Sequence, residues 1–127
     1  MKLWIDDVRP VPEGYVWCKS VYEAKILILK KENAQIMYED EAGFHLRNSD
    51  MQEYFRLIRL RDLCFIELID VDHDLGDYAK DGGDGVKLLD WLEETSRNYP
   101  IRIHSANAVG VQNMRRIIER NGWKEVF

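Results

Sequence analysis

The sequence lacks any apolar run of the roughly 20 residues that a membrane-spanning helix needs. We expect no leader either, because Met1-Lys2 passes directly into a short strand-like run, without the longer apolar segment of a signal peptide. We therefore expect a protein that does not enter a membrane and that works in the cytoplasm.

Cysteine and positive charge are also scarce. The only two cysteines, Cys18 and Cys64, lie in apolar surroundings without metal-type spacing, which favours reduced core thiols. A net charge of −5 argues against broad electrostatic binding to nucleic acid and leaves room only for a local basic face. The composition, 46% hydrophobic and 32% charged over 127 residues, fits one soluble globular domain, 1–127.

Apolar runs and turn residues alternate in a pattern that predicts strands and helices in succession. Ser20-Val21-Tyr22-Glu23 has the form of a capping box, and Gly122 stands where the last helix should stop. Two prolines and Gly14 exclude a helix over 9–14. The predicted strands are 2–5, 15–18, 63–71, 101–104 and 123–127, and the predicted helices are 20–32, 84–95 and 109–121, with a loop at 77–83.

Residues 33–62 form an additional segment in this pattern. Apolar and polar residues alternate on both sides of a turn at 39–43, which predicts a β-hairpin over 34–47. A second capping box, Ser49-Asp50-Met51-Gln52, then opens a helix. We expect this insertion to serve as a substrate lid or as a surface for a protein partner.

Alternating strands and helices imply an α/β fold with a mainly parallel sheet. In such sheets, ligands bind beyond the carboxyl ends of the strands. Three polar clusters lie at the carboxyl ends of predicted strands, and we expect them to meet at one site. They are Asp6-Asp7, Asp72-His73-Asp74 and His104-Ser105-Ala106-Asn107.

The carboxylates suit a hard divalent ion, with Mg²⁺ expected first and Mn²⁺ as its alternative. Asp6, Asp7 and Asp72 are the candidate ligands, although any one of them could instead cap a turn. Asp70-x-Asp72-x-Asp74 is not a calcium loop, because Leu75 stands where that loop needs glycine. An aspartate-nucleophile phosphatase remains a minor alternative.

The histidines suggest catalysis. His73 and His104 lie at strand ends beside acids, so we predict that they share acid and base roles across a phosphoryl group, and Asp72 is a further catalytic candidate. A structural role is the competing interpretation for each. Three groups are candidates for hydrogen bonding to a phosphate: Ser105, Asn107 and the backbone at Gly110. Helix capping is the alternative role for Asn107.

The strand-end acids and Ser105 resemble the receiver domains of two-component signalling. That resemblance implies a flavodoxin-like three-layer sandwich with five strands in the order 2-1-3-4-5. It also implies that Asp6 and Asp7 hold magnesium, that Asp72 is the phosphate-acceptor position and that Ser105 is the hydroxyl position.

Three segments resemble more specifically the motifs of the cyclic-phosphate processing receiver-like family. They are Leu3-Trp4-Ile5-Asp6-Asp7-Val8-Arg9-Pro10, Asp72-His73-Asp74-Leu75-Gly76 and His104-Ser105-Ala106-Asn107-Ala108-Val109-Gly110. The resemblance implies metal-assisted opening or hydrolysis of a cyclic phosphate, on a small molecule or on RNA 2′,3′-cyclic phosphate ends during RNA repair. Asp74 and Arg9 are candidates for supporting the site, and the role of Asp74 stays open between orienting His73 and reaching the metal.

Departures from signalling receivers keep other functions open. A helix is missing between the first two predicted strands, and Lys124 falls within the last strand rather than just after it. Both departures weaken phosphorylation-driven switching. The alternatives are a phosphate- or nucleotide-binding signalling module without turnover, and a degenerate receiver that binds a partner through the insertion.

Overall fold

The computed structural model describes residues 1–8, 10–40, 43–46 and 66–127. Two compact units are present, one formed by Met1–Lys25 with Ile66–Phe127 and the other by Ile26–Phe65. Arg9, Cys64 and the helix predicted to open at Ser49 lie outside the described residues. The prediction of one domain with an insertion at about 33–62 stays a prediction.

The first unit is built on a five-stranded parallel sheet. Its strands are Lys2–Ile5 (β1), Tyr15–Cys18 (β2), Leu68–Val71 (β5), Ile101–Ile103 (β6) and Glu125–Val126 (β7). They pair in the order β2-β1-β5-β6-β7, all parallel. Numbered along this sheet, that order is 2-1-3-4-5, so the predicted flavodoxin-like α/β fold is confirmed.

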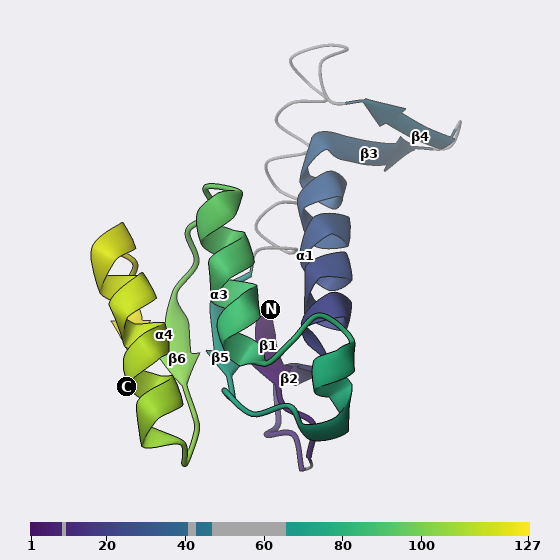
Figure 1. Cartoon of the computed structure of the whole chain (residues 1–127). Helices are drawn as coiled ribbons and strands as arrows, with labels where there is room; N and C mark the ends of the chain where they lie inside the picture. Colours follow the sequence, from purple (N-terminus) through teal and green to yellow (C-terminus); the bar gives the residue numbers. More distant parts are fainter. Residues whose placement is uncertain (9, 41–42, 47–65) are drawn as a thin grey trace. The chain divides into compact units, whose positions relative to one another are not determined.

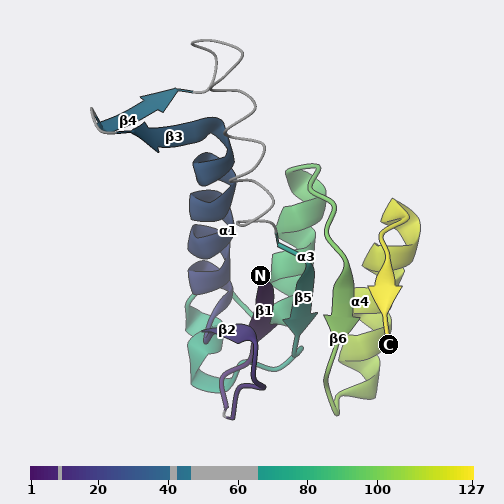
Figure 2. The ribbon, with the colours of Figure 1, turned by 180° about the vertical axis from the view of Figure 1, so that it is seen from behind.

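Two helices cover one face of this sheet. Helices α3 (Gly85–Glu94) and α4 (Ala108–Asn121) lie side by side, in front of the strands in Figure 1 and behind them in Figure 2. The core between these helices and the sheet is formed by buried apolar side chains, among them Leu3, Ile5, Ile69, Val71, Leu88, Leu89, Leu92, Ile101, Met114 and Ile118. The second helical layer expected of a three-layer sandwich is not found among the described residues of this unit.

The opposite face of the sheet carries larger and more polar side chains. Trp4 pairs in register with Trp17 and with Asp70, and Asp70 pairs with Arg102. Register partners in a parallel sheet project to the same side. A row of two indoles, a carboxylate and a guanidinium therefore crosses this face.

Helix α1 (Val21–Ile36) begins in the first unit and continues into the second. Its start matches the predicted capping box, since the Ser20 hydroxyl accepts the Glu23 amide at 3.1 Å. The helix runs four residues past the predicted end at 32. The strands Met37–Asp40 (β3) and Gly43–Leu46 (β4) then pair antiparallel, which confirms the predicted hairpin.

Other boundaries differ from prediction at the ends of elements. Strand β5 begins at Leu68 rather than at 63, because its neighbour β1 begins at Lys2 and that residue pairs with Leu68. The loop predicted at 77–83 contains a 3₁₀ helix, Gly76–Lys80 (η2). Gly122 ends α4 in the left-handed conformation, as predicted. Within the described ranges, no helix has the length and apolar character needed to cross a membrane.

Candidate metal and phosphate site

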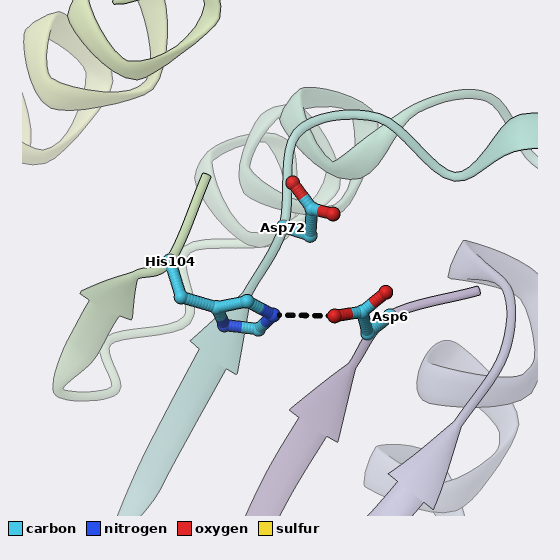
Figure 3. A group of neighbouring side chains, drawn as sticks. All are labelled: Asp6, Asp72 and His104. Carbon is cyan, nitrogen blue, oxygen red and sulfur yellow. Dashed lines mark hydrogen bonds and ion pairs between the residues drawn. The ribbon is translucent and has the colours of Figure 1, made fainter. Parts of the chain in front are cut away.

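Asp6, Asp72 and His104 meet at the carboxyl edge of the sheet. Each follows its strand directly, and Figure 3 shows the three side chains facing a common space beyond β1, β5 and β6. Their amides extend the hydrogen bonding of the sheet: Asp6 N–H donates to Cys18 O (3.1 Å), Asp72 N–H to Ile5 O (2.9 Å) and His104 N–H to Val71 O (3.0 Å). The sheet itself therefore sets the spacing of the three side chains.

The donor atoms of these three residues form a compact group. One ligand-type atom from each of Asp6, Asp72 and His104 lies within 4.8 Å of the other two. His104 Nε2 and Asp6 Oδ2 are 3.0 Å apart, and the second oxygen of Asp6 accepts the Val8 amide at 2.9 Å. Asp72 has a similar contact, because its Oδ1 accepts Asp74 N–H at 3.4 Å. A backbone amide therefore orients one oxygen of each aspartate.

Asp7 borders this group without joining it. Burial raises the pKa of Asp7, and hydrogen bonding with Asp6 and the charges of Asp6 and Asp72 raise it further, against a backbone hydrogen bond that lowers it. The three predicted metal ligands are therefore close enough to repel one another. The group with mutually close donor atoms, however, contains His104 in place of Asp7.

Asp70 is a site residue that the sequence prediction did not include. Its side chain is fully buried on β5, and His104 Nδ1 lies 2.6 Å from its Oδ1. On the other oxygen it accepts the Tyr15 hydroxyl at 3.4 Å and faces the Arg102 guanidinium at 3.6 Å. The signal in the sequence was an acid inside the otherwise apolar run Leu68-Ile69-Asp70-Val71.

His104 is enclosed on several sides. Its ring stacks on Trp4 with the centroids 3.8 Å apart and an interplanar angle of 6°. Burial lowers the pKa of His104, but the hydrogen bonds and charges of Asp70 and Asp6 outweigh it, so the pKa is raised overall. Stacking on Trp4 thus fixes the plane of the imidazole ring, and each of its nitrogens contacts a carboxylate.

His73 belongs to a second group of side chains. Its Nδ1 lies 2.8 Å from Asp74 Oδ1, and a donor atom of Asp84 lies within 4.8 Å of both. The hydrogen bond with His73, followed by that from Asn107, lowers the pKa of Asp74. The His73 ring lies instead against Gly110 of α4. His73 is therefore absent from the group around Asp6.

Asn107 caps helix α4. Its side-chain Oδ1 accepts the backbone N–H of Gly110 at 2.9 Å, and its backbone N–H donates to Ser105 Oγ at 3.2 Å. The Gly110 N–H is thus already bonded, which is the capping alternative rather than the predicted phosphate contact. The Asn107 side-chain amide donates to both oxygens of Asp74, at 3.2 and 3.3 Å. Gly110 is also packed closely, because a Cβ there would lie 2.4 Å from the His73 ring.

Comparison with known proteins identifies the family. A model of the family described as "Cyclic-phosphate processing Receiver domain" matches residues 41–120, which is more than half of the chain. The match includes His73, Asp74, His104 and Ser105 and leaves Asp6 outside. Searches of curated proteins and of solved structures found no match. With a receiver-type sheet order and this family match, the chain belongs to the cyclic-phosphate processing receiver domain family.

Proposed function

We propose that this protein opens a cyclic phosphate with the help of a divalent metal ion, and that an RNA 2′,3′-cyclic phosphate end is its candidate substrate. The observation that carries the proposal is the meeting of Asp6, Asp72 and His104 at the carboxyl edge of the sheet. Membership of a family named for cyclic-phosphate processing supplies the substrate class.

The donor set fits a divalent cation. Two carboxylates and an imidazole nitrogen converge, and the negative charge of Asp7 lies beside them. Mg²⁺ prefers oxygen ligands, whereas an imidazole shifts the preference toward Mn²⁺ and later transition metals. We therefore propose Mn²⁺ before Mg²⁺. Such an ion would supply Lewis-acid polarisation of a phosphoryl oxygen.

The residues of the chain divide the remaining work in this proposal. His104 contributes Nε2 to the ion-binding group instead of transferring protons, which revises the role predicted from sequence. His73 keeps the acid–base role, with Asp74 orienting its ring through Nδ1. Ser105 Oγ accepts the Asn107 amide, so its own hydrogen is available for donation to a phosphoryl oxygen.

The test is incubation of the protein with MnCl₂ or MgCl₂ and an RNA oligonucleotide that ends in a 2′,3′-cyclic phosphate. Ring opening is followed by ³¹P NMR, which separates the cyclic ester from 2′- and 3′-monoesters. We expect conversion with Mn²⁺, its loss in Asp72→Asn and His73→Gln, and wild-type conversion in Asp81→Asn, which alters an exposed acid beyond η2.

Each other result has a defined meaning. Conversion that persists in Asp72→Asn would contradict the assigned site. Saturable binding of the RNA without ring opening under either metal would replace the enzyme with a phosphate-binding module. Labelling of Asp72 by acetyl phosphate, detected by mass spectrometry, would instead restore the signalling interpretation.

A further inference from the structure

We propose that Asp70 is a positioning residue that fixes the tautomer and the orientation of His104, so that Nε2 presents its lone pair to the space shared by Asp6 and Asp72. The consequence for metal binding rests on the proposed function, whereas the tautomer itself does not. The role is separate from those of Asp6 and Asp72, because Asp70 lies beneath His104 in the sheet and not in the ion-binding group.

The position of Asp70 needs explanation because burial of a carboxylate is costly. It lies at the centre of β5, paired in register with Trp4 and Arg102, and it is completely buried. Replacing a buried ion pair by well-packed apolar side chains often leaves the stability of a protein unchanged or raises it. The chain nevertheless places an acid in this strand and surrounds it with three polar partners. Tyr15 and Arg102 compensate the buried charge, and His104 is the partner that reaches the ion-binding group.

The bond to His104 selects one tautomer of the neutral ring. An ionised carboxylate accepts hydrogen bonds and donates none, so the 2.6 Å contact from Nδ1 to Asp70 Oδ1 requires the hydrogen on Nδ1. The other nitrogen, Nε2, is then the one that gives up its hydrogen when the ring becomes neutral: with the hydrogen it donates to Asp6, and without it it carries the lone pair. It is the atom 3.0 Å from Asp6 Oδ2 and the one that joins Asp72 in the compact donor group.

Two further contacts hold the orientation. Trp4 stacks flat on the imidazole and prevents the ring from tipping out of its plane. Tyr15 and Arg102 occupy Asp70 Oδ2 and leave Oδ1 turned toward His104. Carboxylates that accept the second N–H of a metal-binding histidine work in this way, and their loss typically weakens metal binding about 10- to 100-fold.

The same neighbours predict what an amide would do at this position. In Asp70→Asn, the Tyr15 hydroxyl and the Arg102 guanidinium both donate, so they attract the amide oxygen. The amide NH₂ group then faces His104 and donates to Nδ1, which moves the ring hydrogen to Nε2. A nearly isosteric substitution therefore inverts the tautomer and blocks the lone pair at the site.

The experiment is ¹⁵N NMR of the His104 imidazole in the metal-free 127-residue protein, at a pH high enough for the ring to be neutral. We expect the Nδ1–H tautomer in the wild type and the Nε2–H tautomer in Asp70→Asn. Mn²⁺ titration by calorimetry should show affinity about 10- to 100-fold weaker in Asp70→Asn. Tyr15→Phe is the matched control, because it removes a contact to Oδ2 and leaves the Nδ1 bond in place.

An Nε2–H tautomer in the wild type would overturn the proposal, as would a folded Asp70→Asn variant with unchanged tautomer and Mn²⁺ affinity. If circular dichroism shows that Asp70→Asn does not fold, the wild-type spectrum decides alone. The two proposals can also fail separately. A wild type that carries the Nδ1–H tautomer but opens no cyclic phosphate would refute the function and leave the role of Asp70 intact.

Discussion

At the scale of single residues, the site is organised around one imidazole between two carboxylates. His104 has Asp70 on Nδ1 and Asp6 on Nε2, and its pKa is raised in spite of the burial of the ring. The two acids have different surroundings, since Asp70 is fully buried and Asp6 keeps 15% of its side chain exposed. Asp6 is therefore accessible to a cation that takes the place of the proton between it and His104 Nε2, whereas Asp70 is closed off from solvent.

Cys18 gives a prediction at the same scale. Cys18, at the end of β2, is 2% exposed, and burial raises the pKa of its thiol to about 12. Because the thiolate is the reactive form, we expect the folded protein to react with a thiol reagent far more slowly than the unfolded protein. The measurement is absorbance with a disulfide reagent at about pH 8, in a Cys64→Ser background. Equal rates with and without denaturant would contradict the prediction.

The limits of sequence prediction are clearest at Asp70 and His73. Asp6, Asp72 and His104 could be predicted to meet because strand ends converge in a parallel sheet. The role of Asp70 could not, because its histidine partner is 34 positions away and the register of β5 and β6 decides the contact. His73 was expected at the common site, but its ring lies against Gly110 of α4 and is bonded to Asp74 instead, a placement that depends on where α4 packs.

At the scale of elements, α3 and α4 are joined by a polar contact at their exposed ends. Arg120 donates two hydrogen bonds to Glu93, at 2.7 and 2.6 Å, and the Asn121 amide donates to the same carboxylate. These hydrogen bonds, from Arg120 first, lower the pKa of Glu93 to about 2.

The Glu93 contact predicts a dependence of stability on pH. A carboxylate whose pKa is depressed by folding stabilises the native state above its unfolded pKa of about 4.3, and this stabilisation disappears as the pH falls through the folded value. We expect Glu93→Gln to lower the melting temperature at about pH 7, and the difference from wild type to shrink at about pH 2. Thermal denaturation of both proteins provides the comparison. A difference that is constant with pH would show that the charge of Glu93 contributes nothing.

Close packing at the start of α3 gives a second prediction for an element. Gly85 begins the helix, and a Cβ added there would lie 1.9 Å from the Asp72 carbonyl oxygen. Alanine normally favours helix over glycine by about 1 kcal/mol, but overpacking of this kind costs about 1–3 kcal/mol. We expect Gly85→Ala to lower the free energy of unfolding and to displace Asp72.

Gly122→Ala is the control for this prediction. A Cβ at Gly122 meets nothing within 4 Å, so only the left-handed backbone is penalised, by about 1–2 kcal/mol. Urea denaturation of both variants measures the two losses, and Mn²⁺ titration measures any effect on Asp72. If Gly85→Ala were as stable as the wild type, the contact between α3 and the strand end could not be this tight.

Most elements could be predicted because hydrophobic periodicity and caps are local signals. The prediction was less accurate at element ends, which depend on partners elsewhere in the chain. Helix α1 continues to Ile36, directly before the hairpin, and β5 starts only where β1 offers a partner. The 3₁₀ helix at Gly76–Lys80 follows a strand end rich in acids, a composition that favours a loop as readily.

At the scale of the whole molecule, the carboxyl edge of the first unit concentrates negative charge. Asp6, Asp7 and Asp72 lie near enough for their charges to oppose ionisation of Asp7. Folding therefore brings Asp72 beside the adjacent pair Asp6-Asp7, from which it is far removed in the sequence. A cation bound at this edge would relieve their repulsion in the native state alone.

This coupling predicts that metal stabilises the fold. At a free Mn²⁺ concentration about 100 times the dissociation constant, the free energy of unfolding should rise by about 2.7 kcal/mol. That change corresponds to a shift in melting temperature on the order of 10 °C for a domain of this size. Differential scanning calorimetry with MnCl₂, and then with excess chelator, measures the shift and its reversal.

Variants of two aspartates give the controls for the thermal shift. Asp72→Asn should melt above the wild type without metal, because one repelling charge is gone, and should respond little to Mn²⁺. Asp81→Asn should respond like the wild type. A shift of equal size in Asp72→Asn would place the bound ion elsewhere in the molecule.

The stacking of Trp4 on His104 also gives the site an optical readout. An imidazolium in van der Waals contact with an indole quenches its fluorescence, and the two rings are parallel at 3.8 Å. The emission of Trp4 should therefore change when a cation takes the place of the Nε2 proton, before any substrate is added. With the other three tryptophans replaced by phenylalanine, the emission maximum and intensity of Trp4 would report occupancy of the site in real time.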